Sequence, residues 1–113
     1  MHIAMVSGEY PPRWGGIGSV VFHLAGHLAQ RGHDGTVITR MHKQPTPHQP
    51  GVSVLQVPWM KAPMAFTRSY GKHALTELRR LHQVKPVDVV HTLLPLVSWT
   101  AKEYLWVEEH VAP

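Results

Sequence analysis

The sequence predicts an α/β domain with a Rossmann-like, doubly wound and mainly parallel sheet. Short apolar runs alternate along the chain with segments whose apolar residues recur at helical spacing. A glycine-rich turn at residues 15–18 separates the first apolar run from the first of these segments. Strand, glycine turn and helix in this order aim backbone N–H groups and a helix N-terminus at an anion. The glycines either bind a phosphate, which is the first function that the pattern indicates, or only supply positive φ and close packing of the strand against the helix.

The first half of the chain contains two expected strands around one helix. Residues 2–6 are almost continuously apolar, as in a strand that is buried on both faces of a parallel sheet. The helix that follows has Ser19 as its expected N-cap and Gly32 at its C-terminal stop. Its apolar residues recur at helical spacing: Ile17, Val21, Leu24 and Leu28. Residues 36–40 then form the second expected strand.

The second half repeats the alternation. Residues 52–57 alternate apolar and polar side chains and predict a third strand, and residues 87–91 predict a fourth. Between these strands, Pro86 ends a helical segment whose apolar face contains Leu75, Leu78 and Leu81. A last helix is expected over residues 95–109. We expect all four strands, at 2–6, 36–40, 52–57 and 87–91, to lie in one sheet.

The residues around the glycine turn form a dense pattern. It consists of SGEYPP at 7–12, GGIG at 15–18, HLA at 23–25, RGHD at 31–34 and TVITR at 36–40. This pattern resembles the N-terminal domain of family 4 glycosyltransferases, which have the GT-B fold and include enzymes similar to glycogen and starch synthases. PVDVVH at 86–91 is similar to a later strand of that domain. The resemblance is dense over residues 1–40 and thinner over 52–95.

The resemblance implies transfer of a sugar from a nucleotide-sugar donor to a hydroxyl of a sugar or lipid acceptor. The donor is a substrate, and no cofactor is implied. Enzymes of the family have two Rossmann-like domains that face a cleft, with the acceptor mostly on the N-terminal one. Residues 1–113 are then a single, partial N-terminal domain, because the family's C-terminal Glu-x7-Glu motif has no counterpart in them. We therefore expect this chain alone to transfer no sugar.

The glycine turn supplies most of the candidate ligand-binding residues. The resemblance places the backbone N–H groups of three glycines near the donor diphosphate: Gly15, Gly16 and Gly18. Glu9 and Arg13 flank the turn, where they either meet an acceptor hydroxyl or a phosphate or are simply solvated. Tyr10 and Trp14 either stack on a sugar ring or cap the end of the sheet.

His91 is the candidate catalytic residue. It closes the fourth expected strand, and the C-terminal ends of parallel strands border the ligand crevice of such sheets. The alternative is a buried histidine that makes one backbone hydrogen bond. Relatives commonly have His-x-His here, whereas this chain has Leu93 at the second position. That departure keeps a second function open, a non-catalytic binding or interaction module that retains the fold and the anion-binding glycine turn.

The composition narrows the remaining functions. The chain has no cysteine, and its best metal-ligand pair, His23 and His27, lacks a third ligand, so we expect no metal site. No segment has the length and apolar character of a membrane span or the layout of a signal peptide, which favours a cytoplasmic location. No nucleic-acid-binding module is recognisable either.

The positive charge of the chain is concentrated in its middle. The formal net charge is +4, and one acidic residue, Glu77, accompanies a run of basic ones: Arg40, Lys43, Lys61, Arg68, Lys72, Arg79, Arg80 and Lys85. Such a run is either a solvated surface or a site for an anionic partner, including lipid head groups at a membrane surface.

Two further features lie outside the site. Gly35 either weakens the second strand or marks a close backbone approach. The final expected helix carries Trp99, Leu105 and Trp106, which either pack on the sheet or form an interface. Because relatives continue the sheet beyond this chain, we expect a second copy or a complementary C-terminal domain to cover its edge.

Overall fold

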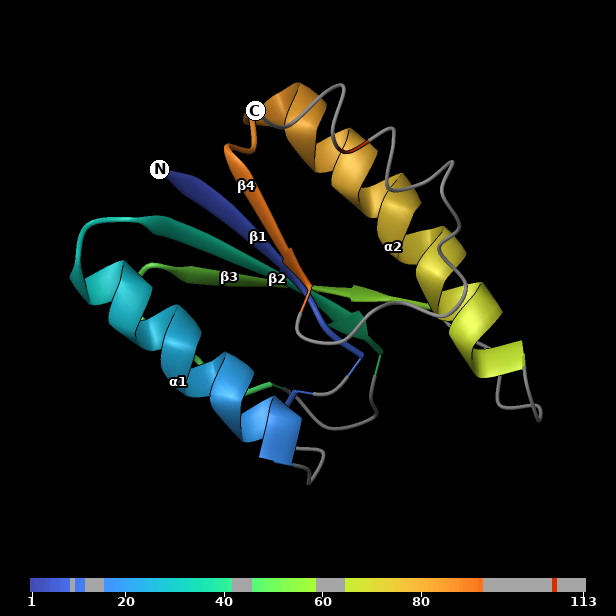
Figure 1. Cartoon of the computed structure of the whole chain (residues 1–113), viewed down its shortest axis with the longest axis horizontal. Coiled ribbons are helices and arrows are strands. Elements are labelled where there is room, and N and C mark those ends of the chain that lie inside the picture. Colours follow the sequence, from blue (N-terminus) through green and yellow to red (C-terminus); the bar gives the residue numbers. More distant parts are fainter. Residues whose placement is uncertain (9, 12–15, 42–45, 59–64, 93–106, 108–113) are drawn as a thin grey trace.

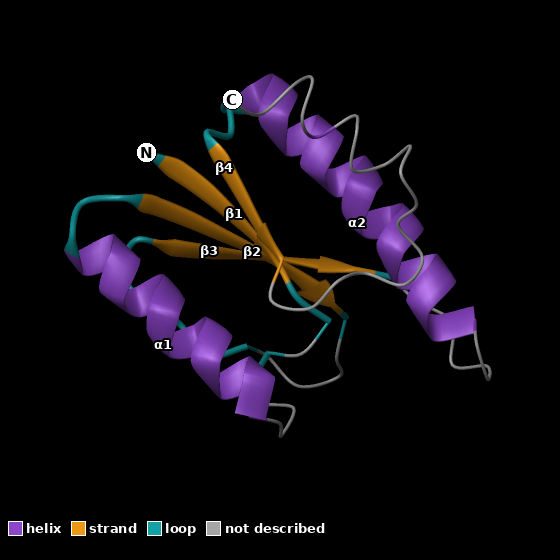
Figure 2. Ribbon diagram, viewed as in Figure 1, coloured by secondary structure: helices purple, strands orange, loops and turns teal. Residues whose placement is uncertain are grey.

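In the part of the chain that the structure describes, a four-stranded parallel sheet carries a helix on each face (Figures 1 and 2). The computed structural model describes residues 1–8, 10–11, 16–41, 46–58, 65–92 and 107. Its elements are β1 (His2–Val6), α1 (Gly16–Gln30), β2 (Asp34–Arg40), β3 (Val52–Val57), α2 (Ala65–Val84) and β4 (Val89–Thr92). The predicted fold class and the placement of all four strands in one sheet are confirmed.

The strand order β3-β2-β1-β4 determines where the helices lie. From β1 the chain moves through α1 to β2, and from β3 it moves back through α2 to β4. These two crossovers run in opposite directions along the sheet, and both have the same preferred hand. The two helices therefore cover opposite faces of the sheet (Figure 2). The order reverses between β1 and β4, and in open α/β sheets ligands bind at the carboxyl ends of the strands at such a point.

Each face of the sheet carries its own hydrophobic core. Along β1, Ile3 and Met5 face α1, whereas Ala4 and Val6 face α2. The α1-side cluster consists of Ile3, Met5, Tyr10, Val21, Ala25 and Val37. The α2-side cluster consists of Ala4, Val6, Ile38, Val57, Tyr70, Ala74, Leu75, Leu78 and Val87. Strands buried on both faces explain why the sequence of residues 2–6 is almost continuously apolar.

The two ends of α1 differ in how well the sequence predicted them. Gly32 ends the helix as expected, with φ of 88° and a Schellman pair in which its N–H donates to Ala29 O and the His33 N–H donates to Leu28 O, both at 3.1 Å. The expected N-cap at Ser19 is wrong, because α1 already begins at Gly16 and Ser19 is an exposed residue of its first turn. Packing begins before Ser19, since Gly18 is buried.

Two strands also differ from their expected bounds. β2 begins at Asp34 rather than at residue 36, because the Asp34 N–H donates to Met1 O at 2.9 Å and extends the pairing with β1. β4 begins at Val89 rather than at residue 87, since the Val87 N–H donates to the His82 ring instead of joining the ladder. The predicted final helix lies outside the described residues apart from Val107, which packs against the α2-side cluster.

We expect Gly35→Ala to raise the free energy of unfolding by about 0.5–1 kcal/mol, because alanine loses less conformational freedom on folding. Among the described residues, a Cβ at Gly35 would meet only Val52 Cγ2, at 4.0 Å, so the close-approach interpretation is wrong. Gly51→Ala is the matched control. Gly51 has φ of 78° and a Cβ there would lie 3.1 Å from Ala29 Cβ, so this variant should be less stable. Urea unfolding measures both, and a destabilised Gly35→Ala would contradict the prediction.

Candidate functional site

The candidate site lies at the carboxyl edge of the sheet, where β1 and β4 end and α1 begins (Figure 1). Gly16 is the first residue of α1, and Gly18 is buried within the first turn. The first N–H groups of a helix have no partner inside it, and the helix dipole places partial positive charge there. This edge can therefore hold an anion. Gly15, Glu9 and Arg13 lie outside the described residues.

His91 joins the same edge from the neighbouring strand. It pairs with Met5 of β1, and Met5 belongs to the α1-side cluster, so the two residues share the face that α1 covers. The side chain of His91 is exposed, which does not fit the alternative of a buried histidine. β4 continues one residue beyond it, to Thr92. The fold thus brings Gly16, Gly18 and His91 to one edge, although more than 70 residues of sequence separate the glycines from the histidine.

Tyr10 is a packed residue of this region. It is fully buried, and its ring lies 6.0 Å from that of Phe22 between centroids. Gln49 Nε2 donates to the Tyr10 hydroxyl at 3.4 Å and to Phe22 O at 3.0 Å, and a Cβ at Gly26 would collide with Gln49 Oε1. Burial raises the pKa of Tyr10, and the hydrogen bond from Gln49 opposes that shift. The sequence left two roles open for Tyr10, stacking on a sugar ring or packing at the end of the sheet, and its burial supports packing.

On the face that α2 covers, the Tyr70 hydroxyl forms a hydrogen bond near the end of β2. This hydroxyl donates to Ile38 O at 2.7 Å, and the Ser7 N–H donates to the same carbonyl at 3.1 Å. Burial raises the pKa of Tyr70, while the positive charge of Arg40 opposes the shift. Arg40 itself is only 5% exposed. Arg40 is therefore an interior residue, and it does not contribute to the basic surface that the run of basic residues suggested.

Part of the remaining basic run is neutralised by ion pairs. Arg80 pairs with Glu77 and Lys85 pairs with Asp34, both at 2.7 Å. The pairing with Lys85 lowers the pKa of Asp34. Lys72 and Arg79 are exposed on α2. Lys43 and Lys61, together with Leu93, Trp14, Trp99, Leu105 and Trp106, lie outside the described residues.

The sequence raised two questions about the helices, namely whether they hold a metal ion and whether one of them spans a membrane. His23 and His27 are both exposed on α1, and the ring of His23 stands edge-on to Phe22 at 5.5 Å between centroids. In the described part of the chain, no three His, Asp or Glu side chains are grouped so that they could hold a metal ion. Among the residues that the structure describes, no helix combines the length and the apolar character that crossing a membrane requires.

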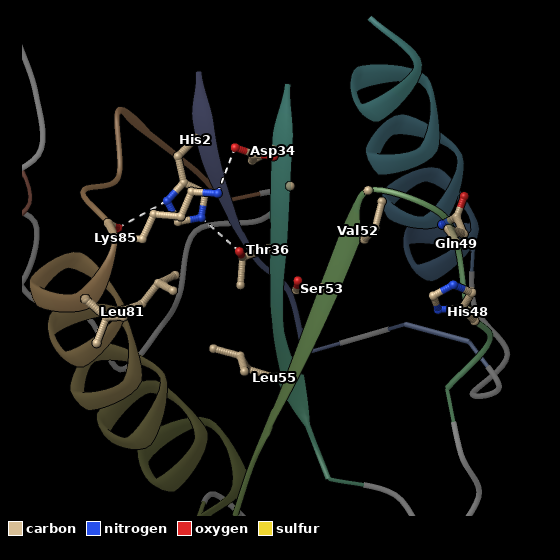
Figure 3. A pocket seen from close by; sticks show the side chains of 13 residues that line it. His2, Asp34, Thr36, His48, Gln49, Val52, Ser53, Leu55, Leu81 and Lys85 are labelled. Atoms are coloured by element: carbon tan, nitrogen blue, oxygen red, sulfur yellow. Dashed lines mark hydrogen bonds and ion pairs between the residues drawn. The ribbon is translucent and has the colours of Figure 1, made fainter. Parts of the chain in front are cut away.

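A pocket of about 550 Å³ lies at the opposite, amino edge of the sheet (Figure 3). Its lining includes Leu55 and Leu81 on one side and Gln49 on the other. The buried His2 of β1 lies beside this pocket and contacts both β2 and the segment that follows α2. Its Nε2 lies 2.9 Å from Thr36 Oγ1, and its Nδ1 lies 3.2 Å from Lys85 O and 3.1 Å from Pro86 O. Sequence reasoning identified none of these contacts, because they join residues 34 to 84 positions apart.

A parallel sheet in the order β3-β2-β1-β4, with a glycine-started helix at its switch point, defines a Rossmann-like domain of the GT-B type. Residues 15–106 match the model of the glycosyl transferase 4-like domain, and the chain belongs to this family. The fold is also that of the crystal structure of WaaG, a glycosyltransferase involved in lipopolysaccharide biosynthesis. That match has a TM-score of 0.60 and 22% identity, and it covers 80% of this chain and 23% of the WaaG chain. A search of curated proteins finds no match.

Proposed function

We propose that this chain supplies the acceptor-side domain of a glycosyltransferase, which transfers a sugar from a nucleotide-sugar donor to an acceptor hydroxyl. The observation that supports this most strongly is the family match, which begins at the glycine turn and extends past His91. The position of that turn adds to it. α1 begins at the carboxyl edge, at the point where the strand order reverses, and ligands of open α/β sheets bind there.

In the proposed reaction, the glycine turn acts on the leaving group. Backbone N–H groups of Gly15, Gly16 and Gly18 and the positive end of the α1 dipole face the donor diphosphate. Negative charge grows on this group as the sugar leaves, so fixed N–H dipoles stabilise the transition state more than the ground state. His91, exposed on the same edge, contacts the transferred sugar or its phosphate. We propose that Glu9 and Arg13 meet an acceptor hydroxyl or a phosphate, and the scheme includes no metal or cofactor.

The proposed function requires a second domain or a second chain that forms the other side of the cleft. The chain spans 23% of the length of WaaG, and positioning both substrates against each other supplies much of the rate of a group transfer. We infer that a complementary C-terminal domain or a second copy faces the carboxyl edge or covers β4, where Val89 is 39% exposed. The acceptor is a sugar or a lipid, and Lys72 and Arg79 on α2 offer contact with an anionic membrane surface in the cytoplasm.

We expect this chain alone to bind nucleotide-sugar weakly at the carboxyl edge and to show no turnover. Incubation with a panel of nucleotide-sugars and acceptors, followed by mass spectrometry, tests turnover. Amide chemical shifts in a parallel titration should change at Gly16, Gly18 and His91. His91→Ala is an informative variant because the side chain is exposed and its removal should not disturb folding. Turnover would contradict the first expectation, and unchanged shifts with every nucleotide-sugar would overturn the proposed site.

The alternative from the sequence, a non-catalytic binding or interaction module, gains no support from the comparisons. The same titration separates the two functions. A module without transfer chemistry would leave the shift of His91 unchanged by the sugar part of the donor, because its glycine turn would recognise phosphate alone. Comparing a nucleotide-sugar with the matching nucleoside diphosphate measures this difference.

A further inference from the structure

Three polar residues interrupt the apolar α1 face of the sheet just before its carboxyl edge. Thr39 of β2 pairs with Gln56 of β3, and the Ser7 N–H donates to Ile38 O, which places Ser7 beside Thr39 on the other side. Two positions earlier in each strand the corresponding residues are Met5, Val37 and Val54, all in or against the α1-side cluster. Because side chains alternate along a strand, the polar residues share that face. We call Ser7, Thr39 and Gln56 the polar row.

The hydroxyl of Thr39 has no structural role that the described residues account for. Thr39 is 0% exposed, and within the described part of the chain its Oγ1 has no hydrogen-bond partner. A buried polar group without a partner destabilises a fold, and a valine of the same shape would avoid that penalty. Ser7 is also buried, and Gln56 is half-buried. Residues that lower stability without a structural gain are concentrated at functional sites.

The position of the polar row connects it with the proposed site. Thr39 is the second-last residue of β2, and α1 begins at the same edge of the sheet. Buried or partly buried residues of α1 face the sheet along one stripe, which starts at the edge with Gly18 and continues through Val21, Ala25 and Leu28. Gly18 is therefore the residue of that stripe nearest to the polar row, and it contributes no side chain of its own.

We propose that the polar row binds hydroxyl groups of the neutral sugar on the acceptor. Every member is uncharged and both donates and accepts hydrogen bonds, which matches a sugar hydroxyl, whereas the row itself holds no cation for an anionic group. The unsatisfied Thr39 hydroxyl is the contact that the ligand completes. The ligand reaches it by displacing side chains at the edge, since Thr39 lies one residue from the end of β2. This inference rests on the proposed function and names a subsite within it.

Thr39→Val separates the proposal from a purely structural role. The variant should unfold at a higher temperature, because a buried unsatisfied hydroxyl is removed. It should also bind methyl glycosides about tenfold more weakly, the loss that one hydrogen bond of ordinary strength explains. Thr39→Ser restores a hydroxyl and should recover binding. Thr76→Val is the matched control, because the Thr76 hydroxyl bonds Lys72 O on an exposed part of α2 and should affect neither measurement.

Amide chemical shifts of the 113-residue chain, titrated with a panel of methyl glycosides and separately with inorganic phosphate, provide the measurement. Glycoside-dependent shifts at the polar row that weaken in Thr39→Val support the inference. Unchanged affinity in Thr39→Val, a lower unfolding temperature, or a row that responds to phosphate rather than to glycosides overturns it. If nucleotide-sugars shift Gly16 while no glycoside shifts the row, this inference fails and the proposed function survives. If neither ligand acts at the edge, both fail.

Discussion

Tyr70→Phe should destabilise the chain at neutral pH and stabilise it, relative to the parent chain, at strongly alkaline pH. The hydroxyl of Tyr70 donates to Ile38 O at 2.7 Å, so its removal costs about 0.5–1.5 kcal/mol at neutral pH. The penalty remains at the low end because Ile38 O keeps the hydrogen bond from the Ser7 N–H. Phenylalanine fills nearly the same volume, which leaves the packing of the α2-side cluster intact.

The alkaline effect follows from the pKa of Tyr70. Burial raises this pKa above the usual value of 10.0, and the charge of Arg40 only partly opposes the shift. The contribution of Tyr70 to stability is therefore complete below pH 10 and decreases as pH rises, because the unfolded chain releases the proton first. Each pH unit above 10 removes up to about 1.4 kcal/mol. Tyr70→Phe lacks this loss, so the two stability curves should cross within about one pH unit above 10.

Urea unfolding at neutral pH and at several values above pH 9 measures both curves. Tyr10→Phe is the control on the other face of the sheet. Burial raises the pKa of Tyr10 less strongly than that of Tyr70, so this variant should flatten the alkaline slope less. Parallel pH profiles for the parent chain and Tyr70→Phe would contradict the prediction.

The sequence predicted the elements whose bounds depend on local patterns. The strands at residues 2–6 and 52–57 agree with β1 and β3, because burial on both faces and alternation leave direct signatures in the order of residues. Gly32 agrees because only glycine readily adopts a φ of 88° at a helix end. Ser19 failed as an N-cap because α1 extends back to Gly16, which places Ser19 inside the first turn of the helix.

The candidate site was predictable where a continuous motif or a general rule of the fold locates the residue. The glycine turn is continuous in sequence, and His91 follows from the rule that strand ends border the crevice. The Gln49 bond to Tyr10 spans 39 residues and gives no periodic signal. The burial of Arg40 was equally hidden, because its charge suggested a surface residue. Likewise, the unsatisfied hydroxyl of Thr39 depends on the surroundings of one atom, and no motif encodes it.

His2→Phe should lower the free energy of unfolding by about 1–3 kcal/mol, because it removes the partner of the buried Thr36 hydroxyl and of two partly buried carbonyls. The ring of His2 bonds the Thr36 hydroxyl with one nitrogen and faces the Lys85 carbonyl with the other (Figure 3). The second nitrogen also lies 3.1 Å from the Pro86 carbonyl oxygen. Phenylalanine retains an aromatic ring at this position but offers none of these bonds. The backbone of His2 also pairs with Asp88, so the loss should spread to the junction of β1 with the segment before β4.

Lys85→Met is the control for His2→Phe. It removes the ion pair between Lys85 and Asp34 at the same edge while keeping the Lys85 carbonyl that faces His2. Because that pair is solvent-exposed, its loss should not change stability measurably. Urea unfolding compares the two variants, and hydrogen exchange at the Asp88 amide, which donates to His2 O at 2.8 Å, reports local opening. His2→Phe should accelerate exchange there, whereas Lys85→Met should not. Equal stability of His2→Phe and the parent chain would mean that water replaces the lost partners and that His2 does not hold this edge together.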